Sequence, residues 1–281
     1  MPNNWRNNFF GPAWTYDSHT GQYYLHSFLK EQPDLNWDNP EVRTAIASVI
    51  RFWLERKIDG FRLDVAHHYC KDKELRNNPA LFTRKHLKKI HISTDQTLIA
   101  NVMNLFSLPV FQVCEYNQHL PETHQILKEF KKIFNSYPGV TSVGEIISQR
   151  PEITASYYGQ DNDELDMNFY FEILHCRWKA ASFRRCIERW EKVLPDDAWP
   201  AYALSNHDVT RAISRYSNGK EAGKAYLLMM LLLTLRGTPF IYYGEELGMQ
   251  EVLLSRKQLK DPVGLKWHPF HRGRDGCRTP M

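Results

Sequence analysis

Helix-type and strand-type segments alternate along this chain, and their order restricts the fold more than any other feature. A helical stripe of apolar residues begins after Asn39, a good N-cap, and runs to about residue 54. The strand-type run "IDGFRLDV" follows it at 58–65. Strands that alternate with helices form parallel sheets or barrels, in which ligands bind at the carboxyl ends of the strands. The pattern therefore predicts an α/β protein with a parallel sheet or barrel.

The same order repeats further along the chain. Helices are predicted at about 121–135, 181–192 and 225–235, and strands within "GVTSVGEI", "AWPAYALSNHD" and "TPFIYYGEEL". The run "ELDMNFYFEI" is a further candidate strand. Residues 1–38 are rich in Asn, Gly, Pro and Trp and have no sustained period. Two parts are therefore predicted, an irregular segment at 1–38 and an α/β domain at 39–281.

Composition excludes several classes of protein. The 281 residues are 42% hydrophobic and 24% charged, which is typical of globular chains. A net charge of +4 with scattered lysines and arginines gives no electrostatic case for nucleic acid. The longest apolar run, Ala225–Leu235, is too short to span a bilayer and predicts a buried helix. Five distant cysteines without a CxxC pair fit reduced thiols, so we expect a cytoplasmic protein, with its oligomeric state left open.

Three carboxylates stand at the ends of three strand-type runs. Asp64 closes "GFRLD", Glu145 closes "TSVGE", and Asp208 closes "YALSNHD". Each one alone is ambiguous, because a carboxylate after a strand is often a helix N-cap. On one parallel sheet, however, the three would converge at the same edge. Two carboxylates that flank a glycosidic bond suffice for its hydrolysis, so this trio is the candidate active site.

Arg62 raises the question of why a buried strand should carry a charge beside an acid. In a strand, Arg62 and Asp64 share one face, while Phe61, Leu63 and Val65 share the other. One interpretation is a structural ion pair; the other is a catalytic carboxylate that the arginine holds ionised. Glu145, near other carboxylates, would tend to keep its proton, as a general acid must.

Several motifs resemble those of the α-amylase superfamily, glycoside hydrolase family 13. These are "GFRLDVAHH", "VGEI" and "SNHD", and "QPDLN" at 32–36 resembles the motif of the oligo-1,6-glucosidase and α-glucosidase branch. "GTPFIYYGEELGM" and "GRDGCRTPM" resemble its last barrel strand and the loop that follows. The similarity extends along nearly the whole chain. It implies a (β/α)8 TIM barrel, of which residues 39–281 would form the C-terminal part.

The resemblance assigns roles to six residues. It implies that Asp64 is the nucleophile, that Glu145 is the acid/base, and that Asp208 binds sugar hydroxyls and stabilises the transition state. Three others would bind substrate or the nucleophile: Arg62 beside the nucleophile, His207 at a substrate hydroxyl and Arg274 near the terminal glucose. Asn206 is expected to shape its turn.

The chain also departs from the family pattern. Nothing matches the earlier motif on the third strand, which supplies an aspartate and a histidine to the terminal sugar. The sequence ends at "RTPM", where relatives continue into a β-domain. We therefore expect an incomplete barrel that lacks the first three strands and the C-terminal β-domain, with residues 1–38 as the remnant of the insertion after the third strand.

The function that the resemblance implies is that of a retaining α-glucosidase. It would cleave α-1,4 or α-1,6 bonds of short oligosaccharides through a covalent glucosyl intermediate, without an organic cofactor. Calcium or magnesium occurs in some relatives, but the sequence indicates no site for either. Three alternatives stay open: a glucosyl-transferring or sucrose-isomerising enzyme, an inactive truncated fragment, and a non-catalytic interaction subunit.

Other polar residues have plainer interpretations. The potential metal ligands of "HHYCKD" fit no common zinc spacing, and we expect packing and loop roles for His67, His68, Cys70 and Asp72. His119 and His124 are predicted to lie at the surface near a helix start.

Glu245 and Glu246 follow the last predicted strand. No catalytic motif includes them, so both are expected to be structural or supporting residues. In the N-terminal segment, Trp5, Trp14 and Phe9 either stack on sugar or pin that segment to the barrel, and the sequence does not decide between these roles.

Overall fold

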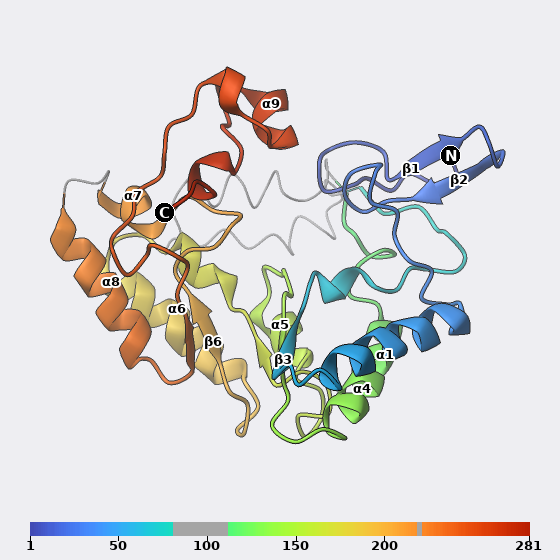
Figure 1. Cartoon of the computed structure of the whole chain (residues 1–281), viewed down its shortest axis with the longest axis horizontal. Coiled ribbons are helices and arrows are strands. Elements are labelled where there is room, and N and C mark those ends of the chain that lie inside the picture. Colours follow the sequence, from blue (N-terminus) through green and yellow to red (C-terminus); the bar gives the residue numbers. More distant parts are fainter. Residues whose placement is uncertain (81–111, 218–220) are drawn as a thin grey trace. The chain divides into compact units, whose positions relative to one another are not determined.

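The computed structural model describes residues 1–80, 112–217 and 221–281 (Figure 1). The chain folds into two compact units. Unit 1 comprises Met1–Asn168 and Trp190–Ala198, and unit 2 comprises Phe169–Arg189 and Trp199–Met281.

The parallel sheet of unit 1 has the strand order β3-β4-β5, formed by Gly60–Leu63, Thr141–Gly144 and Met167–Asn168. Leu63 pairs with Gly144, and Gly144 pairs in turn with Asn168. A Cβ atom on Gly144 would lie 2.4 Å from the Leu165 side chain and 2.5 Å from that of Asn168, so glycine is required there by close packing. This register fixes which residues follow the two strands side by side.

Helices precede or connect these strands, as the alternating pattern predicts. They are α1 (Pro40–Leu54), α4 (Pro121–Phe134) and α5 (Pro151–Ser156). Asn39 caps α1 as predicted, because its side chain accepts a hydrogen bond from the backbone N–H of Glu41. Each of the three helices has proline at its first position, where no intrahelical donor is needed.

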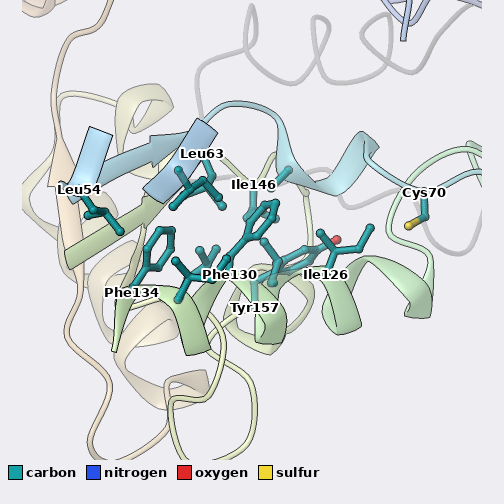
Figure 2. Packing of buried hydrophobic residues seen from close by; sticks show 13 residues of the cluster. Leu54, Leu63, Cys70, Ile126, Phe130, Phe134, Ile146 and Tyr157 are labelled. Carbon is teal, nitrogen blue, oxygen red and sulfur yellow. The ribbon is translucent and has the colours of Figure 1, made fainter. Parts of the chain in front are cut away.

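The hydrophobic core of unit 1 lies between α4 and β3 (Figure 2). Phe130 and Phe134 project from α4 toward Leu63 and Ile146, and the ring of Phe134 stacks on that of Phe61 at 5.5 Å. Burial of each such side chain stabilises the fold by about 1.5–3 kcal/mol. The core thus anchors the strand that leads to Asp64.

The apolar stripe of α1 is divided between core and solvent. Ile50 and Leu54 are buried, whereas Val49 and Trp53 are 51% and 46% exposed. The sequence pattern identified the helix correctly but overestimated the width of its buried face.

The sequence had indicated that residues 1–38 are irregular, but part of this segment has regular structure. They contain an antiparallel hairpin of β1 (Trp14–Asp17) and β2 (Gln22–Leu25). Trp5 is 1% exposed, stacks on Trp14, and donates from Nε1 to the backbone oxygen of Arg76 at 2.8 Å. These contacts support the pinning role for both tryptophans. The division of the chain at residue 38 stays a prediction.

Unit 2 contains a second parallel pair, β6 (Ala201–Ala203) with β7 (Thr238–Phe240). Its helices are α6 (Ala180–Val193, whose last turn lies in unit 1), α7 (Ala212–Ser217), α8 (Ala222–Thr234) and α9 (Pro262–Trp267). Short 3₁₀ turns occupy Arg256–Gln258 and Asp275–Cys277.

Two predictions for this region need correction. The strand in "ELDMNFYFEI" ends at Asn168 apart from one bridge at Phe169, and a 3₁₀ helix follows at Phe171–His175, where Glu172 is buried against Arg189. The apolar helix α8 is not fully buried. Among the residues that the structure describes, no helix is long and apolar enough to cross a membrane.

Candidate active site

In unit 1, one guanidinium connects two carboxylates. Nη1 of Arg62 lies 2.6 Å from Oδ1 of Asp64, and Nη2 bonds to Oε2 of Glu145. The two acids differ in access, since the Asp64 side chain is 70% exposed and that of Glu145 is 6% exposed. A buried carboxylate needs a partner of opposite charge, and Arg62 supplies it.

The strand register brings these groups together. Leu63 and Gly144 are paired at the ends of β3 and β4, so the next residues, Asp64 and Glu145, leave the sheet at the same edge. The N–H of Glu145 still donates to the carbonyl of Leu63 at 2.9 Å. The predicted proximity of Arg62 and Asp64 is present. The sequence predicted that neighbouring carboxylates keep Glu145 protonated. This stays a prediction, because the group that contacts Glu145 in unit 1 is the cation of Arg62.

The chain turns immediately after Asp64. Val65 has φ 36° and ψ 45°, a left-handed conformation that β-branched residues rarely adopt. Such a residue costs roughly 1–3 kcal/mol of strain. The turn leads into a 3₁₀ helix at Ala66–His68. The predicted face shared by Phe61, Leu63 and Val65 is therefore wrong at Val65, since the strand has already ended.

Three histidines, His67, His68 and His119, form a cluster at the 3₁₀ helix that follows this turn. His67 and His68 are buried, and the ring of His119 stacks on that of His67. His119 Nδ1 is 3.0 Å from the Tyr157 hydroxyl, and burial lowers the pKa of His119 to about 4. His119 is half-buried rather than fully at the surface, because the rings of His67 and Tyr157 cover part of it. His124 is partly buried as well, 2.7 Å from Glu164.

The expected packing roles in "HHYCKD" are present. His68 packs on Phe28, Cys70 is buried in the core, and Asp72 binds Arg76. Within residues 1–80, 112–217 and 221–281, no group of three His, Cys, Asp or Glu side chains is arranged to hold a metal ion.

A partly buried ion pair connects "QPDLN" to the same turn. Lys71 Nζ lies 3.0 Å from Oδ2 of Asp34, with side chains 13% and 17% exposed, and it also donates to the backbone oxygen of His68. Burial lowers the pKa of Lys71, while Asp34 opposes that change. Through Lys71, Asp34 of the "QPDLN" motif therefore fixes the segment that follows Asp64.

In unit 2, Asp208 accepts hydrogen bonds from two arginines. Its Oδ1 is 2.8 Å from Nη1 of Arg274 and 3.0 Å from Nη2 of Arg278. His207 Nε2 lies 3.2 Å from Oδ2 of the same carboxylate. Asn206 shapes the turn as expected, since its Oδ1 accepts from the N–H groups of Asp208 and Val209.

Sequence reasoning missed two residues of this cluster. Arg278 is four positions after Arg274 in the quoted "GRDGCRTPM", so the motif itself held the signal. Asp261 precedes a proline at a helix start, where a carboxylate is ordinary, and the sequence carried no sign of its bonds to Arg274.

Glu245 has the structural role that was predicted. It accepts from the Ser205 hydroxyl at 2.8 Å and from the N–H of Tyr242 at 3.1 Å. Burial raises its pKa. Glu245 thus joins the loop after β7 to the end of β6.

Six candidate residues form two groups in the structure. Unit 1 brings together Arg62, Asp64 and Glu145, and unit 2 brings together His207, Asp208 and Arg274. Asp64 and Glu145 come directly after β3 and β4, and His207 and Asp208 come a few residues after β6, on the side where α/β folds bind ligands.

The whole chain, residues 1–281, matches the family described as "Alpha amylase, catalytic domain". The chain belongs to this α-amylase family. It is 42% identical to a probable alpha-glucosidase of Rhizobium meliloti (strain 1021) and 32% identical to an oligo-1,6-glucosidase of Parageobacillus thermoglucosidasius. In both comparisons the alignment covers 100% of this chain, and 49% and 51% of the respective relative.

A solved structure has the same fold as this chain. The crystal structure of the alpha-glucosyl transfer enzyme XgtA matches with a TM-score of 0.88 and 38% identity, over 100% of this chain and 50% of that one. The predicted fold class, a (β/α)8 barrel of which this chain holds part, is confirmed. The chain spans about half the length of the α-amylase relatives that it matches.

Proposed function

We propose that this protein acts as a retaining α-glucosidase on α-1,4 or α-1,6 bonds of short oligosaccharides. The observation that carries the proposal is the Arg62 guanidinium between an exposed Asp64 and a buried Glu145. One accessible carboxylate and one enclosed carboxylate suit the two roles of glycoside cleavage. The names of the two relatives, an alpha-glucosidase and an oligo-1,6-glucosidase, support the same substrate class.

The mechanism divides the work between the two acids. Asp64 attacks the anomeric carbon and forms a glucosyl ester, while Glu145, which this scheme requires to be protonated once substrate is bound, donates its proton to the departing glycosidic oxygen. Glu145 then removes a proton from water, which attacks the anomeric carbon and releases Asp64. Arg62 orients Asp64 and Glu145 through its two terminal nitrogens.

The second group contributes binding in this proposal. Asp208 accepts hydrogen bonds from sugar hydroxyls and stabilises the positive charge that develops at the anomeric centre. His207 binds a further hydroxyl, and Arg274 lies near the terminal glucose. No organic cofactor enters this scheme. The free thiols of all five cysteines support a cytoplasmic location as part of the proposal.

Glucosyl transfer is the second candidate, and the similarity to an alpha-glucosyl transfer enzyme favours it specifically. Transfer and sucrose isomerisation use the same glucosyl ester and differ in whether a sugar hydroxyl or water attacks it. Product analysis with maltose and with sucrose separates them. Free glucose as the main product supports hydrolysis, whereas new oligosaccharides or isomers support transfer.

The proposal is tested by measuring the activity of the Asp64→Asn variant. The variant is made in the natural full-length protein and is purified with any subunit that binds to it. An asparagine cannot form the ester, so turnover of maltose, isomaltose and an aryl α-glucoside should fall by at least about a thousandfold. Asp59→Asn is the matched control, because this exposed carboxylate lies at the opposite end of β3. Near-normal turnover by Asp64→Asn would refute the nucleophile assignment. An inactive wild type would favour the inactive-fragment or interaction-subunit alternatives.

A further inference from the structure

Asp261 binds Arg274 through three hydrogen bonds. The carboxylate is 1% exposed, and it accepts hydrogen bonds from the Arg274 backbone N–H at 3.0 Å, from Nε at 3.2 Å and from Nη2 at 2.8 Å. Arg274 thereby neutralises a charge that burial would otherwise make costly. Nε and Nη2 both donate to Oδ1 while the backbone N–H donates to Oδ2, and together these bonds restrict the rotation of the guanidinium.

The remaining terminal nitrogen points elsewhere. Nη1 of Arg274 lies 2.8 Å from Oδ1 of Asp208, whose side chain is 35% exposed. Arg274 therefore bridges two carboxylates. The buried one, Asp261, holds the arginine, and the accessible one, Asp208, belongs to the candidate site. Lysine cannot reproduce this arrangement, because an ammonium group is a point charge without a planar fork.

We propose that Asp261 is a positioning residue that aims Nη1 of Arg274 at Asp208. The inference rests on the proposed function, in which Asp208 meets the sugar. Asp261 itself does not touch substrate; it acts through Arg274. Since the guanidinium is held in advance, binding need not order a flexible arginine, whose side-chain entropy is roughly 2 kcal/mol.

The surrounding loop is built around the Asp261 carboxylate. Gly273 has φ 72°, and a Cβ atom there would lie 2.5 Å from Oδ2 of Asp261. Glycine thus permits both the backbone conformation and the close approach. Asp275 fixes the other side, because its Oδ2 accepts from the backbone N–H of Asp261 at 2.8 Å.

Arg278 provides a comparison on the same carboxylate. Its Nη2 also reaches Asp208, but its Nε donates to the backbone carbonyl of His207 at 2.8 Å. A carbonyl holds a guanidinium less strongly than a buried carboxylate does. Arg274 is therefore the better fixed of the two arginines, and the difference is attributable to Asp261.

A double-mutant cycle in the natural protein tests the proposal. The variants are Asp261→Asn, Arg274→Ala and the two combined. Asp261→Asn should lower kcat/KM for an aryl α-glucoside by about 10–100-fold, because a small misplacement of a positioned group is costly. In the Arg274→Ala background the same change should alter kcat/KM by less than about threefold, since the two residues act as one unit. Equal losses in both backgrounds would overturn the proposal.

Asp275→Asn is the control for a merely structural effect. It loosens the same loop through the N–H groups of Lys260 and Asp261, so its effect on kcat/KM should be the same with and without the Arg274 side chain. If the coupling energy between Asp275 and Arg274 were as large as that between Asp261 and Arg274, this would also count against a specific role for Asp261.

A structural measurement, which does not depend on catalysis, tests the positioning role of Asp261 separately from the proposed α-glucosidase function. In a crystal structure of Asp261→Asn, Nη1 of Arg274 should leave Oδ1 of Asp208 by more than about 1 Å, because the uncharged amide no longer holds the guanidinium. An unchanged Arg274–Asp208 contact would overturn the positioning role, whether or not the wild type cleaves glucosides. A wild type that cleaves none, together with a displaced Arg274, would refute the function alone.

Discussion

The imidazole rings of His119 and His67 stack with their centroids 4.8 Å apart and their planes 22° from parallel. Two rings in this arrangement cannot both be protonated at low cost, because like charges would meet in a buried cluster. Burial lowers the pKa of both, that of His119 to about 4. Tyr157 and the backbone oxygen of Ile147 also contact His119, and the nearby His124 lowers its pKa further.

Stability should therefore fall between neutral and mildly acidic pH. The folded-state pKa of His119 lies below its ordinary value of 6.5, so the unfolded chain binds the proton more readily. The stabilisation by neutral His119 is complete above pH 6.5 and is lost as the pH falls toward 4, by about 3 kcal/mol at most. Urea unfolding at pH 7, 6, 5 and 4.5 measures the slope.

His119→Gln should flatten that slope, because glutamine can still meet the Tyr157 hydroxyl but cannot become charged. His19→Gln, at an exposed position in the β1–β2 turn, should leave it unchanged. A slope that stays the same in His119→Gln would mean that other groups cause the pH dependence.

Loss of the Lys71 ammonium should destabilise the turn after Asp64. Lys71→Met removes the cationic partner of the partly buried Asp34 carboxylate and leaves only its two hydrogen bonds from Ser27, so we expect a loss of about 3 kcal/mol in unfolding free energy, the low end for a broken buried pair. Lys30→Met is the matched control, because Lys30 and Glu31 form a pair whose side chains are 68% and 65% exposed. That change should cost less than about 0.5 kcal/mol. Similar small effects for both variants would contradict the importance assigned to the buried pair.

Glu145 should show a dependence on the leaving group. Glu145→Gln should lose at least about a hundredfold on maltose, the usual scale for removal of a general acid. The loss should be much smaller on an aryl α-glucoside with an activated phenol, which needs little protonation to depart. Pre-steady-state release of the phenol measures ester formation directly. Equal losses on both substrates, with ester formation rate-limiting in each, would argue against the acid role.

The exposed face of α8 should promote self-association of residues 1–281 expressed alone. Tyr226, Leu227, Met230 and Leu233 are between 53% and 76% exposed, and contiguous apolar surface of this kind favours association. Met230→Lys with Leu233→Lys should lower the mass measured by light scattering at a given concentration. Thr234→Lys adds charge to the same helix without removing apolar surface, and it should have less effect. A monodisperse wild-type monomer at high concentration would show that this face does not drive association.

Local interactions were the part of the structure that the sequence could predict. Asn39 and Asn206 each bond to backbone groups within three positions, so the residue type and its neighbours suffice. Arg62 and Asp64 are two residues apart, and their contact could be anticipated in the same way. The family motifs then supplied Glu145, 83 positions from Arg62 in the chain, which no local rule reaches.

The remainder depends on packing that a single sequence does not reveal. His119 is a polar residue near a helix start, and its partial burial follows from rings contributed by two other segments. The role of Asp261 depends on a loop that returns to it 13 positions later. Val65 adopts its left-handed conformation because the chain must turn between β3 and the 3₁₀ helix, against the preference of valine.

The pairing of Leu63 with Gly144 has a consequence for how this site tolerates change. Backbone hydrogen bonds set the spacing of Asp64 and Glu145, and no substitution other than proline removes them. Core side chains can therefore change while that spacing stays constant. Insertion or deletion of one residue in either strand would instead shift one acid by about 3.3 Å along the sheet and turn its side chain to the opposite face. Point substitutions and length changes in these two strands are therefore subject to very different selection.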